Sequence, residues 1–363
     1  MPAGDSCYTP REIASERGQD TRPGRRLQVA IDYKNWMRDT LDYAKTLRQI
    51  AIPGSHDAGM YMSINCSIAA GSCNTQTQTK RMYDQLAAGM RYFDLRPAWN
   101  SGVLYTGHFT SVVALGTEGC EGDTLVNILN EVRDFLLQLI SREVVILKFS
   151  HYYDRSANKF EFNDNQKRTL IDLVTGILGR WLYVNDTAAR LADISLSRIV
   201  DPNKANVIAV FEDMPLSLLQ PGTYRYGAYL PPPPPPGQKC GTQHGAVEGD
   251  LSVYDEYSNT NELAVMEADQ LDKLDCAVNH GGDLFLLSWT LTQSAVQAAD
   301  CLVGIGPTIV ELAQPAIDSI VPRLARHRIT GANIPNVVYL DVSPTQATDA
   351  CIEVNQRLGN NKI

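Results

Sequence analysis

The sequence predicts an α/β protein in which a parallel sheet is covered by crossover helices. Short apolar runs alternate along the chain with longer segments of helical periodicity, and this is the pattern of strands joined by helices. Most of the short runs are apolar throughout, as expected for strands that are covered on both faces. The 363 residues could hold two average domains, but a single α/β barrel with insertions also reaches this size.

The predicted elements follow one another from the N-terminal third to the end of the chain. Strands are expected at residues 49–53, 92–95, 103–106, 144–149, 207–211, 284–289 and 337–341. Helices are expected at residues 80–88, 123–140, 163–178, 261–277 and 307–324. In the helix at 123–140, leucine, isoleucine and valine recur at helical spacing, and Asp123 or Thr124 can serve as its N-cap. That apolar face is therefore predicted to be core.

Composition changes too little along the chain to mark a domain boundary, so we expect one (β/α)8 TIM-type barrel at residues 46–345. A long insertion is expected around residues 214–250, a polar extension with a leading helix at 1–45 and a C-terminal tail at 346–363. The insertion contains six consecutive prolines, residues 231–236, which must be extended because proline donates no backbone hydrogen bond. A rigid surface loop is the simpler interpretation, and a docking site for a proline-binding partner is the alternative.

The composition is that of a globular enzyme and argues against two classes of protein. Hydrophobic residues make up 44% and charged residues 20% of the chain, and the net charge is −9. This charge argues against nucleic-acid binding, which depends on cationic side chains, and no apolar run reaches the length of a membrane span. Residues 1–26 lack the apolar core of a signal peptide. We therefore expect a soluble monomer that is cytoplasmic by default, although a secreted protein that has lost its signal would look the same.

The eight cysteines do not form a zinc pattern. They include no C-x-x-C pair and no neighbouring pair of histidines, and they are Cys7, Cys66, Cys73, Cys120, Cys240, Cys276, Cys301 and Cys351. Surface disulfides in an oxidising compartment and scattered reduced thiols both fit the sequence.

An acid, a base and a fixed cation are expected at one edge of the sheet. His56 and Asp57 follow the first predicted strand, Asp94 and Arg96 end the second, and His108 follows the third. Because the carboxyl ends of barrel strands meet at one mouth, these side chains should converge there. A single histidine is more often structural than catalytic, but two histidines at neighbouring strand ends reverse that expectation. The set is suited to moving a phosphoryl group.

Several motifs resemble the X-domain of phosphatidylinositol-specific phospholipase C, of the small bacterial and X-domain-only kind. The resemblance rests on IPGSHD at residues 52–57, GMRYFDLR at 89–96, GHF at 107–109 and EVVILKFSH at 143–151. The stretches LFLLSWTLT at 284–292 and PNVVYLD at 335–341 are similar to the closing strands of such proteins. The likeness spans residues 49–342. It implies a distorted barrel and the cleavage of a phosphodiester to a cyclic phosphate, with a phospholipid or inositol-phosphate-type substrate and transient contact with a membrane surface.

The resemblance also assigns roles to the matching residues. His56 would be the general base that accepts the proton of the attacking inositol hydroxyl, and His108 the general acid on the leaving glycerol oxygen. Asp57 and Asp341 would orient the two histidines. Arg96 would stabilise the charge that grows on the non-bridging phosphate oxygens.

Arg96 also bears on the need for a metal ion. Calcium-dependent relatives carry an E-x-D pair on the second strand, where this chain has Asp94-Leu95-Arg96. An arginine at that position removes a ligand and repels a cation. The chain therefore resembles the metal-independent branch, with no cofactor, and Asp94 is interpreted as a support for Arg96.

Two departures from the family pattern leave the substrate open. The fourth strand ends in Lys148-Phe149-Ser150-His151, so either Lys148 or Ser150 can point into the barrel, and Lys148 is either a second phosphate-facing cation or the buried partner of an acid. Glu212 and Asp213 follow the fifth strand, where bacterial enzymes have a basic residue. The alternatives are therefore a phosphodiesterase for a non-inositol head group and a non-catalytic X-domain that binds or scaffolds. His151 is the one further histidine that we retain as a candidate.

Overall fold

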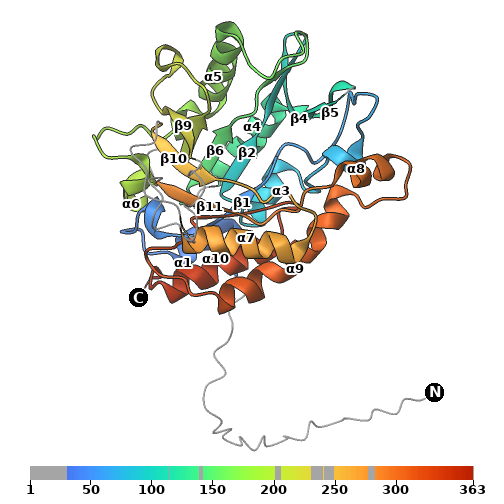
Figure 1. The fold of residues 1–363 in the computed structure, drawn as a ribbon. Coiled ribbons are helices and arrows are strands. Elements are labelled where there is room, and N and C mark those ends of the chain that lie inside the picture. Colours follow the sequence, from blue (N-terminus) through green and yellow to red (C-terminus); the bar gives the residue numbers. More distant parts are fainter. Residues whose placement is uncertain are drawn as a thin grey trace, which may run out of the picture. The chain divides into compact units, whose positions relative to one another are not determined.

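Eight parallel strands from the described part of the chain close into a barrel (Figure 1). The computed structural model describes residues 31–113, 115–138, 142–200, 206–229, 240, 249–276 and 283–362. The predicted α/β barrel is thereby confirmed. The polyproline stretch, Cys7, His244, His280 and most of the expected N-terminal extension lie outside the described residues.

The barrel strands follow the order β1-β12-β11-β10-β9-β8-β6-β2, and every neighbouring pair is parallel. Their bounds are Ile52–Ser55 (β1), Tyr92–Leu95 (β2), Val145–Phe149 (β6), Val207–Phe211 (β8), Thr223–Tyr229 (β9), Leu251–Asp255 (β10), Leu284–Ser288 (β11) and Val337–Leu340 (β12). Pairing of β1 with β12 closes the barrel, with Ser55 opposite Leu340.

Helices cover the outside of the barrel, and α7, α9 and α10 lie along one side of it (Figure 1). The α-helices of the described residues are Trp36–Thr40 (α1), Ser72–Thr75 (α2), Met82–Ala87 (α3), Leu125–Leu136 (α4), Asp164–Leu178 (α5), Leu196–Ile199 (α6), Leu263–Asp275 (α7), Ala295–Leu302 (α8), Ile309–Arg326 (α9) and Thr345–Arg357 (α10). The Thr124 side chain caps α4 by accepting a hydrogen bond from the Asn127 amide at 3.3 Å.

Strand parity divides the core into two layers. On β6, Ile146 belongs to the cluster inside the barrel with Ile208, whereas Leu147 belongs to the cluster beneath the helices with Ala209. Successive side chains point to opposite faces of a strand, so Lys148 shares the inner face with Ile146. Lys148 therefore places a buried charge inside the barrel, near the carboxyl ends of the strands.

A second sheet stands beside the barrel and corrects one prediction. Its strands, in the order β5-β4-β3-β7, are Gly116–Thr124 (β5), Val103–Val112 (β4), Pro97–Asn100 (β3) and Tyr153–Asp154 (β7). The predicted third barrel strand at 103–106 was therefore wrong, because these residues begin β4, which pairs antiparallel with β3 and β5. His108 lies within β4 rather than after a barrel strand. The β4–β5 hairpin extends away from the barrel (Figure 1).

Two other segments differ from expectation. The stretch expected as an insertion, residues 214–250, contains β9, which pairs with β8 and β10 in the barrel wall. The stretch expected as a C-terminal tail, 346–363, contains most of α10. Asn355 of α10 holds both backbone groups of Ala51, at 2.9 Å for the Ala51 amide and 2.8 Å for its carbonyl. These residues are therefore part of the barrel structure.

Three disulfides lie in the described part of the chain and decide between the two interpretations of the cysteines. They join Cys66 to Cys120, Cys73 to Cys301 and Cys240 to Cys276. Cys351 is buried with a free thiol. Among the described residues, no helix has both the length and the apolar character that a membrane crossing requires.

Candidate active site

The carboxyl ends of three neighbouring barrel strands carry most of the predicted site residues. His56 and Asp57 directly follow β1, Asp341 directly follows β12, and Arg96 directly follows β2. Because β1 lies between β12 and β2 in the barrel order, residues far apart in the sequence meet at one mouth. His108 reaches the same place from β4.

His56 is held between a carboxylate and a guanidinium. Its Nδ1 lies 2.7 Å from Asp341 Oδ1, and its Nε2 lies 2.8 Å from Arg96 Nη2. A guanidinium can only donate hydrogen bonds, so Nε2 must accept and the proton of neutral His56 must be on Nδ1. The geometry thus leaves a lone pair on Nε2, and the His56 side chain is 20% exposed.

His108 forms a second pair with a carboxylate. Its Nδ1 lies 2.8 Å from Asp57 Oδ2, and its side chain is 24% exposed. Asp57 is fully buried and has a positive φ of 43°, a left-handed conformation that is uncommon outside glycine. The other carboxylate oxygen of Asp57, Oδ1, has no hydrogen-bond partner among the described residues. Arg96 Nη1 lies 3.5 Å from Asp57 Oδ2, so the guanidinium bridges the two histidine–aspartate pairs.

Asp94 holds the Arg96 side chain in place. Asp94 Oδ2 accepts hydrogen bonds from Arg96 Nε at 3.0 Å and from the Tyr339 hydroxyl at 2.7 Å, and Oδ1 accepts one from Ser150 Oγ at 2.9 Å. Burial alone would raise the pKa of Asp94, but Lys148 and Arg96 hold that pKa well below its usual value. The carboxylate is therefore charged and fixes the guanidinium at Nε, which leaves Nη1 and Nη2 toward the histidines.

Lys148 is the buried partner of two acids. Its Nζ lies 2.7 Å from Asp255 Oδ2 and 3.6 Å from Asp94 Oδ1, and it stands 4.7 Å from the centre of the Tyr226 ring. Burial alone would lower the pKa of Lys148. The carboxylates of Asp255 and Asp94 raise that pKa by a larger amount, so it lies above its usual value. Both Lys148 and Ser150 point inward, because residues two apart share one face of a strand.

Asp255 and Tyr339 are residues of the site that were not predicted from the sequence. Asp255 ends β10 and accepts hydrogen bonds from Lys148 and, at 2.8 Å, from the Tyr226 hydroxyl. The signal that could have found Asp255 is an acid that follows the short run Leu-Ser-Val-Tyr at residues 251–254. Tyr339 lies inside a strand that was predicted, but an inward hydroxyl cannot be distinguished from core by sequence alone.

Glu212 and Asp213 line a neighbouring cavity of about 680 Å³ that also reaches Arg96 and His151. Glu212 Oε2 accepts a hydrogen bond from the His151 amide at 3.2 Å, and the Asp213 carbonyl accepts one from Lys167 Nζ at 2.6 Å. Burial raises the pKa of Glu212. Desolvation inside the cavity, with Arg96 and Lys148 nearby, lowers the pKa of His151. These effects favour its neutral imidazole form beside the cations of the mouth.

The turn after β12 is held from the loop that precedes α3. Lys80 Nζ donates hydrogen bonds to the carbonyls of Val342 at 3.2 Å and Ser343 at 3.0 Å, and the Val342 amide donates to the Thr77 carbonyl at 2.9 Å. Val342 has a φ of 68°, which is a strained conformation for a β-branched residue. These contacts fix the backbone directly after Asp341.

The arrangement supplies two imidazoles, each with its own carboxylate, and one guanidinium that touches both pairs. Such a set can move one proton at each side of a phosphate and can neutralise the charge between them. Among the described residues, no group of three or more His, Cys, Asp or Glu side chains has a metal-binding arrangement.

Comparison with known proteins gives one curated relative and a set of solved structures. A PI-PLC X-box domain-containing protein of Dictyostelium discoideum is 25% identical over 209 residues, which cover 53% of this chain and 25% of that protein. The chain thus spans about a quarter of the length of this relative. No family model matches the chain.

Two of the similar solved structures are bacterial enzymes. Phosphatidylinositol-specific phospholipase C of Listeria monocytogenes aligns with a TM-score of 0.57 at 17% identity, over 90% of this chain and 99% of that chain. The corresponding enzyme of Staphylococcus aureus aligns with a TM-score of 0.57 at 17% identity, over 88% and 97%. At this identity the likeness shows the fold. The chain therefore has the barrel fold of the bacterial phosphatidylinositol-specific phospholipases C, and the resemblance that its motifs indicated is confirmed.

Proposed function

We propose that this protein cleaves the phosphodiester of phosphatidylinositol, or of a related phospholipid head group, without a metal ion. The products would be diacylglycerol and a cyclic phosphate. The observation that carries the proposal is the bridge made by Arg96 between the His56–Asp341 and His108–Asp57 pairs. A protein that only binds a head group has no need of two such pairs.

In the first step, His56 acts as the general base. Its Nε2 carries a lone pair and takes the proton of the inositol 2-hydroxyl while that oxygen forms a bond to phosphorus. Asp341 stabilises the imidazolium that results. Arg96 then releases its hydrogen bond to Nε2, because the protonated nitrogen can no longer accept one.

His108 acts as the general acid on the opposite side of the phosphate. Its proton passes to the glycerol oxygen as the bond from phosphorus to that oxygen breaks, and diacylglycerol leaves as the neutral alcohol. Asp57 orients His108 for this transfer. A water molecule can afterwards open the cyclic phosphate with the two histidines in reversed roles.

Arg96 supplies the permanent positive charge that these steps need. Its Nη1 and Nη2 face the histidine pairs while Asp94 holds Nε. A planar guanidinium can bind two non-bridging phosphate oxygens at once, so the charge on them is stabilised as it grows. We therefore propose that no cation is required.

We propose that side chains at the mouth and inside the barrel recognise the head group. Lys148 lies between Asp94 and Asp255, and a cation with two acid partners can exchange one of them for ring hydroxyls at little cost in charge. Glu212, Asp213 and Ser150 are further hydrogen-bonding groups near the mouth. They suit a polyhydroxylated head group, and they leave a non-inositol head group as the alternative.

The three disulfides favour an oxidising compartment, because reduced thiols are the rule in the cytosol. We propose that the protein works there rather than in the cytoplasm. The six cysteines of these disulfides should then resist alkylation in the protein isolated from its own cells, unless the protein is first reduced. Alkylation of all six without reduction would reject the proposal.

Phosphorus NMR of a phosphatidylinositol digest tests the function directly. The first signal to appear should be that of a five-membered cyclic phosphate, and an acyclic phosphate should follow more slowly. A digest run with excess chelator should give the same time course. Acyclic phosphate from the earliest time point would reject intramolecular attack, and no product from any phospholipid would favour the non-catalytic X-domain.

A further inference from the structure

His108 differs from the other site residues in the element that carries it. His56, Arg96 and Asp341 directly follow barrel strands, so the barrel itself holds them in place. His108 lies in β4, within the hairpin that extends away from the barrel (Figure 1). Its contact with Asp57, at 2.8 Å between Nδ1 and Oδ2, therefore depends on how the hairpin is held against the loop that follows β1.

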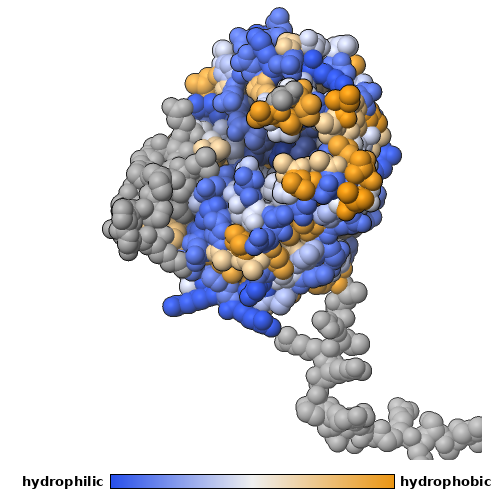
Figure 2. Space-filling model, turned by 45° about the vertical axis from the view of Figure 1, so that its right-hand side comes forward, coloured by the Kyte–Doolittle hydropathy of each residue, from blue (hydrophilic) through white to orange (hydrophobic). Residues whose placement is uncertain are grey.

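Apolar packing contributes little to the position of the hairpin. At its turn, Val113 and Leu115 are 96% and 56% exposed. Figure 2 shows hydrophobic groups at the surface, at separate places around a hydrophilic hollow on one face of the protein. Residues 118–123 of β5 are all buried, but Cys120 is the only one of them with an apolar side chain, and the others are glutamate, glycine and aspartate. Hydrophobic burial, which dominates the packing of most strands, is therefore small along β5.

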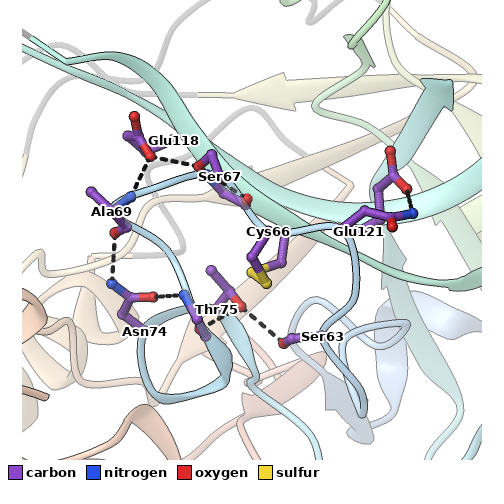
Figure 3. The surroundings of a disulfide bond; sticks show 12 residues. Ser63, Cys66, Ser67, Ala69, Asn74, Thr75, Glu118 and Glu121 are labelled. Carbon is purple, nitrogen blue, oxygen red and sulfur yellow. Dashed lines mark hydrogen bonds between the residues drawn. A yellow bond between two sulfur atoms is a disulfide. The ribbon is translucent and has the colours of Figure 1, made fainter. Parts of the chain in front are cut away.

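A disulfide and hydrogen bonds join β5 to the β1 loop instead. Cys120 of β5 is bonded to Cys66 of the loop, and Figure 3 shows hydrogen bonds around this disulfide. Ser67 Oγ accepts a hydrogen bond from the Gly119 amide at 2.8 Å and donates one to Glu118 Oε2 at 2.5 Å. The covalent bond is the strongest of these connections, because each hydrogen bond also has an alternative partner in water.

Cys120 is the direct neighbour of His108 across the hairpin. The two residues are paired in the antiparallel ladder, and residues directly opposite each other project from one face with their Cβ atoms about 5 Å apart. Cys120 is fully buried, whereas the His108 side chain is 24% exposed. The loop after β1 supplies both Asp57, which is hydrogen-bonded to the imidazole, and Cys66, which is bonded to the strand beside it.

We propose that the Cys66–Cys120 disulfide is a positioning element for His108. The inference rests on the proposed function, because it concerns the proton that His108 gives to the leaving oxygen. By joining β5 to the loop that carries Asp57, the disulfide keeps the imidazole within reach of both Asp57 and that oxygen. A displacement of about 1 Å can cost roughly 10² in rate. The disulfide therefore sets the efficiency of general acid catalysis as well as adding to stability.

Two water-soluble inositol phosphodiesters with different leaving groups test this role. An alkoxide leaving group needs a proton from a general acid, whereas nitrophenolate is a stable anion and leaves without one. In Cys66→Ala/Cys120→Ala, the ratio of kcat for the alkyl ester to kcat for the nitrophenyl ester should fall by at least about tenfold. His108→Ala should lower the same ratio. A general loss of structure would reduce both kcat values together and leave their ratio unchanged.

The matched control is Cys73→Ala/Cys301→Ala, which removes the disulfide between the same β1 loop and α8. These two cysteines are 228 positions apart in the sequence, against 54 for Cys66 and Cys120. Because a longer closed loop restricts the unfolded chain more, the control should lose at least as much stability. It should nevertheless keep the wild-type ratio of kcat values. A wild-type ratio in Cys66→Ala/Cys120→Ala, or an equal fall in both variants, would overturn the proposal.

Nitrogen-15 NMR of the histidine rings separates this inference from the proposed function, because it reports which ring nitrogen carries the proton without any catalysis. A carboxylate only accepts hydrogen bonds, so neutral His108 in wild type should carry its proton on Nδ1, toward Asp57. Cys66→Ala/Cys120→Ala should show a mixture of both tautomers, and the control should not. If wild type cleaves neither ester but the spectra show this pattern, the proposed function fails and the positioning of His108 stands. An unchanged His108 spectrum would reject the positioning.

Reduction of the folded wild type provides a second arm that does not require a variant to fold. Cys66 is exposed, so a soluble phosphine can reach its sulfur; the phosphine is oxidised to its oxide with the oxygen of water, and the disulfide becomes two thiols. Alkylation and mass spectrometry then identify which disulfide has opened. The ratio of kcat values should fall with the alkylated fraction of Cys66 and not with that of Cys73. A wild-type ratio after complete alkylation of Cys66 would refute the proposal.

Discussion

Replacement of Asp341 by asparagine is the sharpest test of the His56 site. The variant keeps the shape of the side chain and removes its charge. In a serine-protease triad the same change costs about 10⁴ in rate, because the amide favours the wrong imidazole tautomer. Here Arg96 Nη2 donates to Nε2 of His56 at 2.8 Å, so a proton on Nε2 would face another donor. The wrong tautomer is therefore disfavoured from the opposite side of the ring.

The expected loss of rate in Asp341→Asn therefore comes only from the lost electrostatic attraction between the carboxylate and the protonated His56. With Asp341 Oδ1 2.7 Å from His56 Nδ1, the centres of charge of carboxylate and imidazolium are roughly 4 Å apart, which corresponds to about 4 kcal/mol at the effective dielectric constant near a protein surface. The asparagine carbonyl recovers a neutral hydrogen bond worth about 1 kcal/mol. A net loss of about 3 kcal/mol corresponds to a decrease in kcat of roughly 10²-fold.

The assay is kcat on phosphatidylinositol in detergent micelles, with thermal unfolding followed by circular dichroism. Asp349→Asn is the matched control, because Asp349 also accepts a side-chain hydrogen bond, from the Tyr33 hydroxyl at 2.9 Å, but far from the mouth. The control should keep the wild-type rate. A loss below about threefold for Asp341→Asn would reduce Asp341 to a turn residue, and a loss near 10⁴ would show that Arg96 does not hold the tautomer.

Three further predictions concern the rest of the site. His56→Ala and His108→Ala should each lower kcat by about 10²–10⁴ with an unchanged circular dichroism spectrum, and near-wild-type turnover of either variant would remove that histidine from the mechanism. Arg96→Lys should lose about 3 kcal/mol of transition-state stabilisation while chelator leaves the wild type fully active; inactivation by chelator with rescue by calcium would contradict this. Because the pKa of Asp94 is held below its unfolded value, its charge stabilises the fold above about pH 4, and this stabilisation is lost as the pH falls toward the folded pKa. Asp94→Asn should therefore melt at a lower temperature at pH 7 and lose less further stability in acid than wild type; parallel melting curves would refute this.

The barrel could be predicted where its strands are mostly apolar. Residues 92–95 and 207–211 were predicted as strands and are β2 and β8 with the same bounds. β9 was missed because its sequence, Thr-Tyr-Arg-Tyr-Gly-Ala-Tyr, alternates tyrosines with polar and small residues. α10 was missed because it buries polar side chains, among them Thr348 and Asn355, in place of an apolar stripe.

The site could be predicted where it depends on barrel closure. Strand order brings Asp341 beside His56 and Arg96 without further information. The position of His108 in an antiparallel hairpin could not be predicted. Its partner strand β5 is rich in glycine and glutamate and does not have a strand-like composition. The Lys148–Asp255 contact was missed for a related reason, since β10 adjoins the segment that had been assigned to an insertion.

Barrel closure also has a consequence for the timing of folding during synthesis. His56 and Asp341 are 285 positions apart in the sequence, and β1 can pair with β12 only after the ribosome has made the whole segment between them. Contacts of such long sequence separation form late, because the loop between them must close first. A nascent chain therefore carries His56 without the Asp341 carboxylate that is hydrogen-bonded to it in the folded protein. The His56–Asp341 pair is thus completed only when β12 joins β1 and the barrel closes.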